Sequence, residues 1–240
     1  MNIFISGTDT DVGKTLIAAG LAAAMQSLGY QSGVFKPLQT GVESNTGFLV
    51  SPDIAYVKGI DPYIEGACTY TFRTPAAPLI AAEVENTIID PKMIIRDYKD
   101  LQSKCDTIVV EGAGGLLAPV APRCTMLDIM TMLNLPVVFV MIPRLGSINH
   151  ILLTLNQAKM SGINVSGVIV NRYPHYLNNP AIKSVPRMIE EYTDYKVLGV
   201  VKEFKNAARI VPSELIDTMI NSVDIEKIFN ITIPKLSIEY

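Results

Sequence analysis

A glycine-rich loop between an apolar run and a helix-like segment constrains this chain most. The loop reads GTDTDVGKT from Gly7 to Thr15, with NIFIS before it and KTLIAAGLAAAM running on from Lys14. It resembles the phosphate-binding pattern G-x-x-x-x-G-K-[ST], except that its first glycine stands one residue early. In such loops, backbone N–H groups and the helix dipole hold a phosphate. Because the loop joins an expected strand to an expected helix, a true phosphate cradle is favoured over a chance Gly-Lys-Thr.

Composition excludes several classes of protein. The chain has 240 residues, of which 49% are hydrophobic, so it can bury one large core, and we expect a single domain over residues 1–240. A net charge of −3 predicts no nucleic-acid partner. No apolar run approaches the ~18 residues of a membrane span, and the N-terminus does not read as a signal peptide. Three cysteines far apart indicate reduced thiols, which together predict a cytoplasmic protein without a membrane partner.

Short apolar runs alternate with helix-like segments along the chain. The expected helices cover 14–29, where Gly29 would follow the last turn, 148–162, and 181–192, which Pro186 interrupts. The expected strands are continuous apolar runs, as in a parallel sheet covered on both faces, and they span 2–6, 32–38, 106–112, 136–142, 166–172 and 195–201. This order predicts a three-layer α/β/α fold with a mainly parallel sheet, of the P-loop NTPase type.

Charged side chains near the expected strand ends are candidates for the site, because ligands bind there in parallel sheets. Lys36 in VFKPLQTG is placed where a strand should end and fits anion binding, although a lone lysine can equally be solvated. Glu111 precedes Gly-Ala-Gly-Gly and suits a Mg²⁺ ligand, with a surface glutamate as the alternative. Asp53 is a further possible metal ligand and fits a helix N-cap equally well.

Two other segments leave their roles open. Asp9 and Asp11 lie in the phosphate loop and suit either a cationic substrate or local turns. Gly146 and Ser147 begin a helix whose free N–H groups suit a carboxylate. From spacing alone, however, Ser147 fits a plain N-cap better.

Several motifs together resemble one family. GTDTDVGKT, KPLQTG, YTFRTPAAP, VEGAGGLLAPV, LGSINHILLT and GVIVNR occur in the order found in dethiobiotin synthetases, ATP-dependent carboxylases of the P-loop superfamily that close the ureido ring of biotin's precursor. The resemblance runs from about residue 1 to 172. It accounts for the longer phosphate loop, which is a feature of that family.

The resemblance implies roles for individual residues. The implied catalytic residues are Lys36, Lys14 and Thr40, and the implied metal ligands are Thr15, Asp53 and Glu111. The implied nucleotide-binding residues are Asp11, Val12, Gly13, Lys14, Thr15, Leu16, Glu111, Gly114 and Asn171, the last of which would read the adenine edge. The implied substrate-binding residues are Thr10, Asp11, Lys36, Thr40, Gly146, Ser147, Ile148 and Asn149, where the last four would serve the partner subunit of a homodimer.

The implied reaction joins CO₂ to 7,8-diaminononanoate with ATP and Mg²⁺, through a carbamate and a carbamic-phosphoric anhydride, and gives dethiobiotin. Two features depart from the family: Asp11 stands where glutamate is common, and the stretch GVVKEFKNAARIVP lacks an Ile-Pro pair near the nucleotide base. The alternative hypothesis is a regulatory ATPase switch of the partition or septum-positioning type. Such switches carry a lysine early in the phosphate loop, whereas this loop begins with TDTD.

Overall fold

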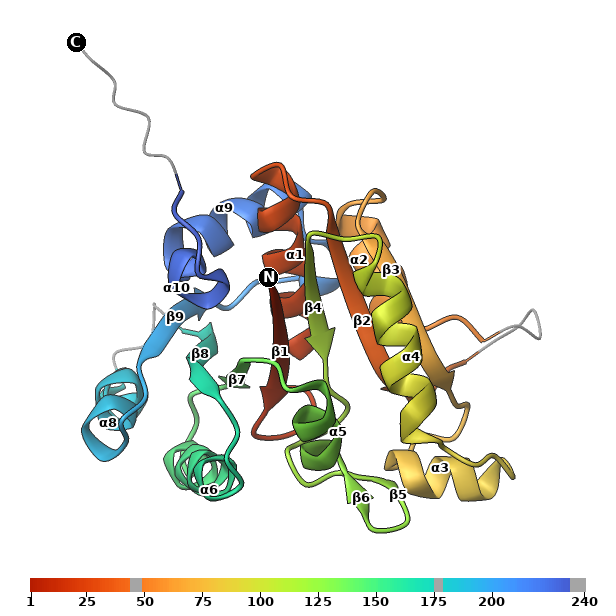
Figure 1. The fold of residues 1–240 in the computed structure, drawn as a ribbon. Coiled ribbons are helices and arrows are strands. Elements are labelled where there is room, and N and C mark those ends of the chain that lie inside the picture. Colours follow the sequence, from red (N-terminus) through yellow and green to blue (C-terminus); the bar gives the residue numbers. More distant parts are fainter. Residues whose placement is uncertain (44–48, 175–178, 234–240) are drawn as a thin grey trace.

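A seven-stranded parallel sheet forms the centre of the computed structural model, which describes residues 1–43, 49–174 and 179–233. The strand order is β3-β2-β4-β1-β7-β8-β9, and every neighbouring pair runs in the same direction (Figure 1). The strands are β1 (Asn2–Gly7), β2 (Ser32–Gln39), β3 (Glu65–Thr71), β4 (Thr107–Glu111), β7 (Val137–Met141), β8 (Val165–Tyr173) and β9 (Val197–Lys202). A small antiparallel pair joins β5 (Pro119–Ala121) to β6 (Cys124–Thr125).

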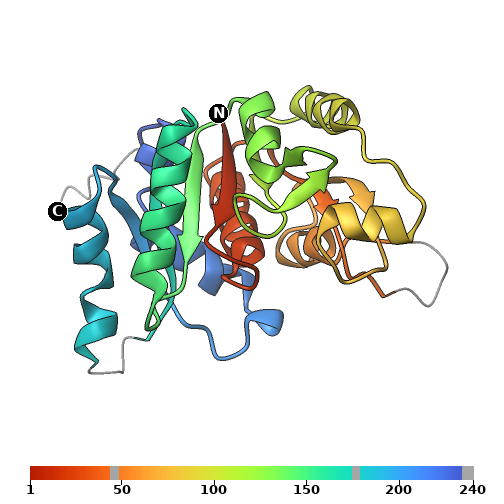
Figure 2. The same cartoon turned by 90° about the horizontal axis from the view of Figure 1, so that it is seen from below.

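Helices cover both faces of the sheet, which confirms the predicted three-layer α/β/α fold. They are α1 (Lys14–Ser27), α2 (Pro52–Ile60), α3 (Pro78–Val84), α4 (Pro91–Gln102), α5 (Met126–Leu133), α6 (Ser147–Met160), α7 (Pro180–Lys183), α8 (Val185–Tyr192), α9 (Pro212–Ser222) and α10 (Ile225–Phe229), with a 3₁₀ turn at Ala207–Arg209. Figure 2 shows α6 and α8 side by side at one end of the sheet. Within the described ranges, no helix is both long and apolar enough to cross a bilayer.

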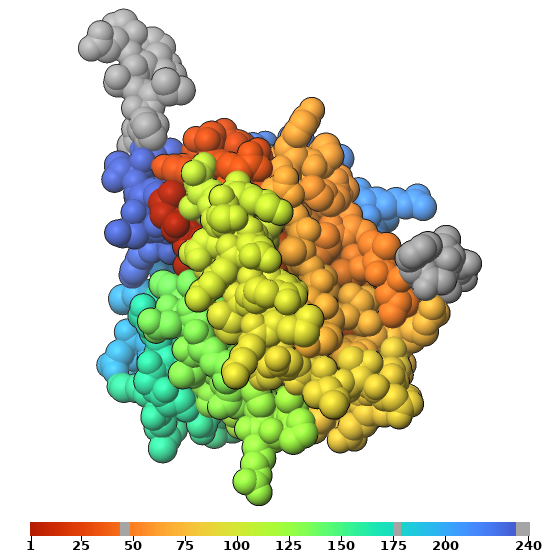
Figure 3. All heavy atoms as spheres, turned by 45° about the vertical axis from the view of Figure 1, so that its right-hand side comes forward, coloured from red at the N-terminus to blue at the C-terminus, as the bar shows by residue number. Residues whose placement is uncertain are grey.

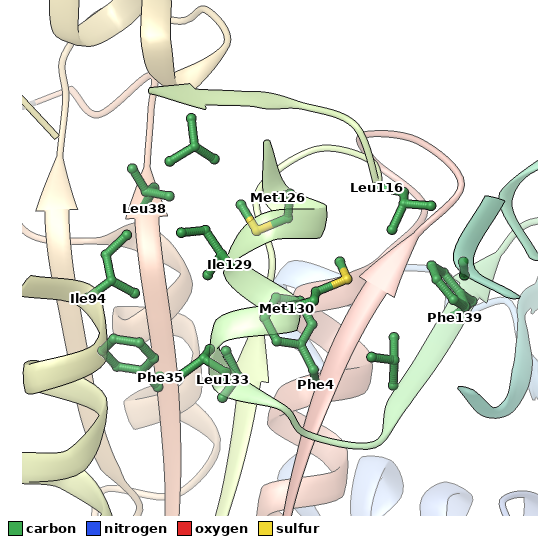
Figure 4. Close-up of a cluster of buried hydrophobic side chains, with 14 of the residues drawn as sticks. Phe4, Phe35, Leu38, Ile94, Leu116, Met126, Ile129, Met130, Leu133 and Phe139 are labelled. Carbon is green, nitrogen blue, oxygen red and sulfur yellow. The ribbon is translucent and has the colours of Figure 1, made fainter. Parts of the chain in front are cut away.

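The hydrophobic core has one part on each face of the sheet. On one face, α1, α2, α9 and α10 pack against strand residues such as Ile3, Ile5 and Val109. On the other, α4, α5, α6 and α8 pack against Phe4 and Phe35, and Figure 4 shows Met126, Ile129, Met130 and Leu133 of α5 in this second part. Figure 3 shows α4 lying across the outside of that face. Because both faces are buried, the strands read as continuous apolar runs rather than alternating ones.

Most of the predicted elements are present, with shifted ends. Helix α1 ends as expected, because Gly29 follows its last turn with a φ of 93°. The predicted helix over 181–192 is two helices, α7 and α8, with Pro186 in the first turn of the second. Strands β3, β5 and β6 and helices α2 to α5, α9 and α10 were not predicted. The EGACTYT segment of β3 is partly exposed and lacks the long apolar run of the other strands.

Candidate active site

The phosphate loop connects β1 to α1, as its motif predicts. Gly13 occupies the N-cap position of α1 with a φ of 87°, a conformation that glycine adopts without strain. A Cβ at this position would lie 2.1 Å from the side-chain nitrogen of Asn171. The Lys14 ammonium donates to the Asp9 carbonyl at 2.8 Å, so the lysine folds back over the loop. The loop thus has the backbone shape and the cation that anion binding requires.

Lys36 lies in the middle of a buried ion-pair cluster. Its Nζ is 2.6 Å from Asp53 Oδ2 and 2.8 Å from Glu111 Oε1. Lys36 is 4% exposed and Glu111 is 1% exposed. Lys36 is therefore not a solvated lysine, and Glu111 is not a surface glutamate, so both alternative interpretations are wrong. Charges this deeply buried are tolerated when they are paired, and each member of this cluster depends on the others.

The prediction that Lys36 ends its strand is wrong, because β2 continues to Gln39. The reason lies in the neighbouring strands. Along β2, strand β4 pairs with residues 32–35 only and ends at Glu111, whereas β3 continues to pair with β2 as far as Gln39. The last part of β2 therefore borders an opening in the sheet where β4 has stopped, and Lys36 stands at the start of that opening.

Asp53 is positioned by the first turn of α2. The N-cap of this helix is Ser51, whose hydroxyl accepts from the Ile54 N–H at 3.2 Å. The reading of Asp53 as an N-cap is therefore wrong. Because Ser51 caps the helix, the Asp53 carboxylate is free to face Lys36 across the site.

Thr15 and the two acids supply oxygen atoms of the kind that Mg²⁺ prefers. The Thr15 hydroxyl donates to Glu111 Oε1 at 2.8 Å, and Glu111 Oε2 is buried without a hydrogen-bond partner among the described residues. In the part of the chain that the structure describes, no three His, Cys, Asp or Glu side chains gather as a metal-binding group. Two carboxylates and a hydroxyl fit Mg²⁺ that arrives with phosphate oxygens and water, because Mg²⁺ keeps several such ligands.

The two lysines differ in their proton affinity. Burial, together with the nearby Lys36 ammonium, lowers the pKa of Lys14 from 10.5 to about 8. Burial also acts to lower the pKa of Lys36, but the Glu111 and Asp53 carboxylates outweigh it and hold that pKa above its usual value. Lys36 therefore holds its proton more firmly than Lys14 does.

One cavity of about 520 Å³ collects most of the predicted site residues. This volume is in the range of small-molecule sites. The predicted residues that line the cavity are Thr10, Asp11, Gly13, Lys14, Thr15, Leu16, Lys36, Thr40, Asp53, Glu111 and Gly114. They come from the phosphate loop and the start of α1, from the end of β2, from α2, and from the end of β4 with the loop after it, which meet at the carboxyl ends of the strands.

Six predicted residues do not line this cavity. Val12, within the phosphate loop, and Asn171, on β8, are both buried, and the Asn171 amide donates to the Val12 carbonyl at 2.9 Å. The other four, Gly146 to Asn149, form the start of α6 and lie outside the cavity of their own chain. The N-cap position of α6 is Gly146, so the prediction of Ser147 as the N-cap is also wrong. The Ser147 hydroxyl instead accepts from the Arg144 N–H at 3.2 Å.

Several lining residues were missed in the sequence. Tyr56, Arg172, Ala207 and Ala208 border the cavity, and the Tyr56 hydroxyl donates to the Ala207 carbonyl at 2.9 Å. Tyr56 follows Asp53 by three residues, so a predicted helix there would have placed both on one face. Ala207 and Ala208 carry no such signal, because small apolar side chains reveal nothing about chemistry. Outside the cavity lining, Arg144 lies 3.5 Å from Asp9 in an exposed ion pair.

Solved structures confirm the fold. The chain is similar to a chain of the MinC:MinD cell division protein complex of Aquifex aeolicus, with a TM-score of 0.62 and 16% identity over 98% of both chains. It is also similar to the septum site-determining protein MinD of Pyrococcus horikoshii, solved with Mg-ADP, with a TM-score of 0.59 and 15% identity over 96% of both chains. At such low identity the likeness establishes the architecture alone.

Sequence relatives are more specific. A family model described as an AAA domain matches residues 1–209. The ATP-dependent dethiobiotin synthetase of Anoxybacillus flavithermus is 34% identical over 85% of this chain and 92% of its own. That of Fusobacterium nucleatum is 38% identical over 72% and 79%, and that of Bacillus licheniformis is 33% identical over 95% of both. With this phosphate loop, this ion-pair cluster and these relatives, the chain belongs to the ATP-dependent dethiobiotin synthetase family.

Proposed function

We propose that this protein is an ATP- and Mg²⁺-dependent cyclo-ligase that carboxylates 7,8-diaminononanoate and closes its ring to give dethiobiotin. The observation that supports this most is the shared cavity in which Lys14 and Lys36 meet Asp53 and Glu111. Two ammonium groups beside a phosphate cradle suit a reaction in which negative charge gathers on a transferring phosphoryl group.

In the proposed reaction, one substrate amine adds to CO₂ and loses a proton to give a carbamate. A carbamate oxygen then attacks the γ-phosphorus of ATP, and the bond to ADP breaks. The second amine attacks the carbonyl carbon of the resulting anhydride and expels phosphate, which closes the cyclic urea. The proposed role of Lys36 is to hold the carbamate and the transferring group, while Lys14 neutralises the phosphates and Thr40 lies beside the substrate.

The proposed ligands of Mg²⁺ are Thr15, Asp53 and Glu111, whose oxygens suit a hard cation. When bound, the ion neutralises the phosphate oxygens and helps to align them. The proposed nucleotide contacts are those of the phosphate loop together with Gly114 and with Asn171, which would lie near the base. The buried Asn171 Oδ1, which has no hydrogen-bond partner among the described residues, is an acceptor suited to the adenine amino group.

We further propose a cytoplasmic homodimer in which each α6 serves the site of the partner. Residues 146–149 lie outside the cavity of their own chain, while the neighbouring Leu145 is 96% exposed. A two-fold dimer would allow the free N–H groups at the start of α6 to receive the substrate carboxylate in the partner's cavity. Asp9 and Asp11, on the phosphate loop, suit the cationic end of the diamine.

The decisive experiment supplies the purified protein with the diamino acid, bicarbonate, ATP and Mg²⁺ and looks for the cyclic urea by mass spectrometry. We expect one ADP for each dethiobiotin, and no product when any component is left out. ATP hydrolysis that is indifferent to the two small substrates would refute the proposal and would favour a regulatory switch. Lys159→Ala, at an exposed ion pair with Asp194, provides the control variant, which should remain fully active.

A further inference from the structure

The Lys36 ammonium occupies the point where the two proposed metal-binding carboxylates converge. It contacts Asp53 Oδ2 at 2.6 Å and Glu111 Oε1 at 2.8 Å, and the same Glu111 oxygen accepts the Thr15 hydroxyl. All three proposed metal ligands are thus joined to one another through hydrogen bonds and ion pairs that a lysine completes.

A divalent ion bound to the same two oxygens would need nearly the same position. Mg²⁺ binds oxygen at about 2.0–2.1 Å, so an ion between these carboxylates would lie against the ammonium that now contacts both. Two cations in a buried pocket repel each other strongly, because little water is present to screen them. Lys36 and the metal therefore compete for Asp53 and Glu111.

Lys36 would gain a replacement partner only when a nucleotide is present. It lines the same cavity as Gly13 and Lys14 of the phosphate loop, so a bound polyphosphate would bring anionic oxygens to its side. If Lys36 moved away from the two carboxylates with no other anion to receive it, its buried charge would bear the full cost of desolvation. The nucleotide thus removes the obstacle to the metal and provides the lysine with its catalytic position.

We propose that Lys36 is a resident counter-cation that keeps the metal site closed in the nucleotide-free protein and yields it when the nucleotide binds. This inference rests on the proposed function, because it concerns the same residues. It implies that metal binds with the nucleotide rather than before it. It also gives one residue two positions, one facing the acids and one facing the reacting groups.

The test is Mn²⁺ binding to the nucleotide-free protein, followed by electron paramagnetic resonance. Lys36→Met and Lys36→Gln should each bind Mn²⁺ at least about tenfold more tightly than the wild type, a coupling of the usual size between sites. Lys159→Met, which removes an exposed lysine, should leave the affinity unchanged. Adding Glu111→Gln to Lys36→Met should abolish the gain. An unchanged or weaker affinity in both Lys36 variants would overturn the proposal.

A measurement on the wild type decides the matter if the Lys36 variants do not fold. Nucleotide-free crystals soaked in Mn²⁺ should give no anomalous peak between Asp53 and Glu111, and crystals with ADP should give one there. A peak in the nucleotide-free crystals would overturn the proposal. Neither result bears on whether dethiobiotin forms, so failure of this inference and failure of the proposed function are separately visible.

Discussion

The Thr15 hydroxyl and Glu111 Oε1 lie 2.8 Å apart, although 96 residues separate them in the sequence. This contact joins the first turn of α1 to the last residue of β4. Since β4 neighbours both β1 and β2 in the sheet, Glu111 stands between the phosphate loop and Lys36. The sheet order therefore brings two of the proposed metal ligands, Thr15 and Glu111, together, while the third, Asp53, comes from α2.

Glu111→Gln should raise the Mg²⁺ concentration that gives half-maximal activity by at least about tenfold, because an amide replaces an anionic ligand. Titrating dethiobiotin formation with Mg²⁺ measures the shift. Glu214→Gln, which breaks only the exposed pair with Lys202, is the matched control. An unchanged Mg²⁺ titration would argue against Glu111 as a ligand.

Lys36→Ala should reduce turnover by a factor on the order of 10²–10³ while ADP still binds, because one cation that stabilises the transferring charge is lost. Single-turnover product formation and ADP calorimetry separate these two effects. Turnover close to that of the wild type would refute the role given to Lys36.

Gly13→Ala should destabilise the fold and abolish nucleotide binding. The new Cβ would lie 2.1 Å from Asn171 Nδ2 at a φ of 87°. Gly29→Ala is the matched control, because Gly29 has a φ of 93° with no atom within 4 Å of the added Cβ. The control should lower the free energy of unfolding by about 1–2 kcal/mol through backbone strain. Gly13→Ala should cost about 1–3 kcal/mol more, because overpacking is added. Equal effects in urea unfolding would contradict this account.

ADP affinity should fall as the pH rises above about 8. Burial lowers the pKa of Lys14 to about 8 in the free protein, and bound phosphates would raise it again. Above that pH the complex holds more protons than the free protein, so raising the pH weakens binding. Calorimetry across this range measures the trend, and Lys14→Arg, which keeps its charge, should remove it. An affinity that stays constant up to about pH 10 would disprove the prediction.

Mixed dimers of Lys36→Ala and Asn149→Asp should recover activity. In a two-fold dimer with sites shared between subunits, random mixing makes half of the dimers mixed, and each of these has one intact site, so about a quarter of the wild-type activity returns. Asn149 is exposed, so its variant should fold, while the added carboxylate repels the substrate. Co-expression and assay of the purified mixture test this. If mixing restores nothing, each site belongs to one chain.

Sequence patterns predicted the sheet better than the geometry of the site. The central strands can be recognised in the sequence because burial on both faces requires unbroken apolar runs. The phosphate loop can be recognised because it has a local sequence motif. The convergence of Asp53 on Lys36 had no such signal, because it depends on α2 and on the early end of β4. Ser51 and Ser147 show the same limit, since several polar residues stand near each helix start and only the backbone decides which one caps.

The hydrogen bond from Tyr56 to Ala207 links parts of the chain 151 residues apart. Tyr56 lies one turn beyond Asp53 on α2. The segment around Ala207 is therefore hydrogen-bonded to the same helix that carries an acid of the site. The cavity is consequently lined by residues from both the N-terminal and the C-terminal parts of the chain. Cutting the chain before residue 207 would remove this contact and loosen the spacing between the acids of the site, even though every charged residue that lines the cavity remained.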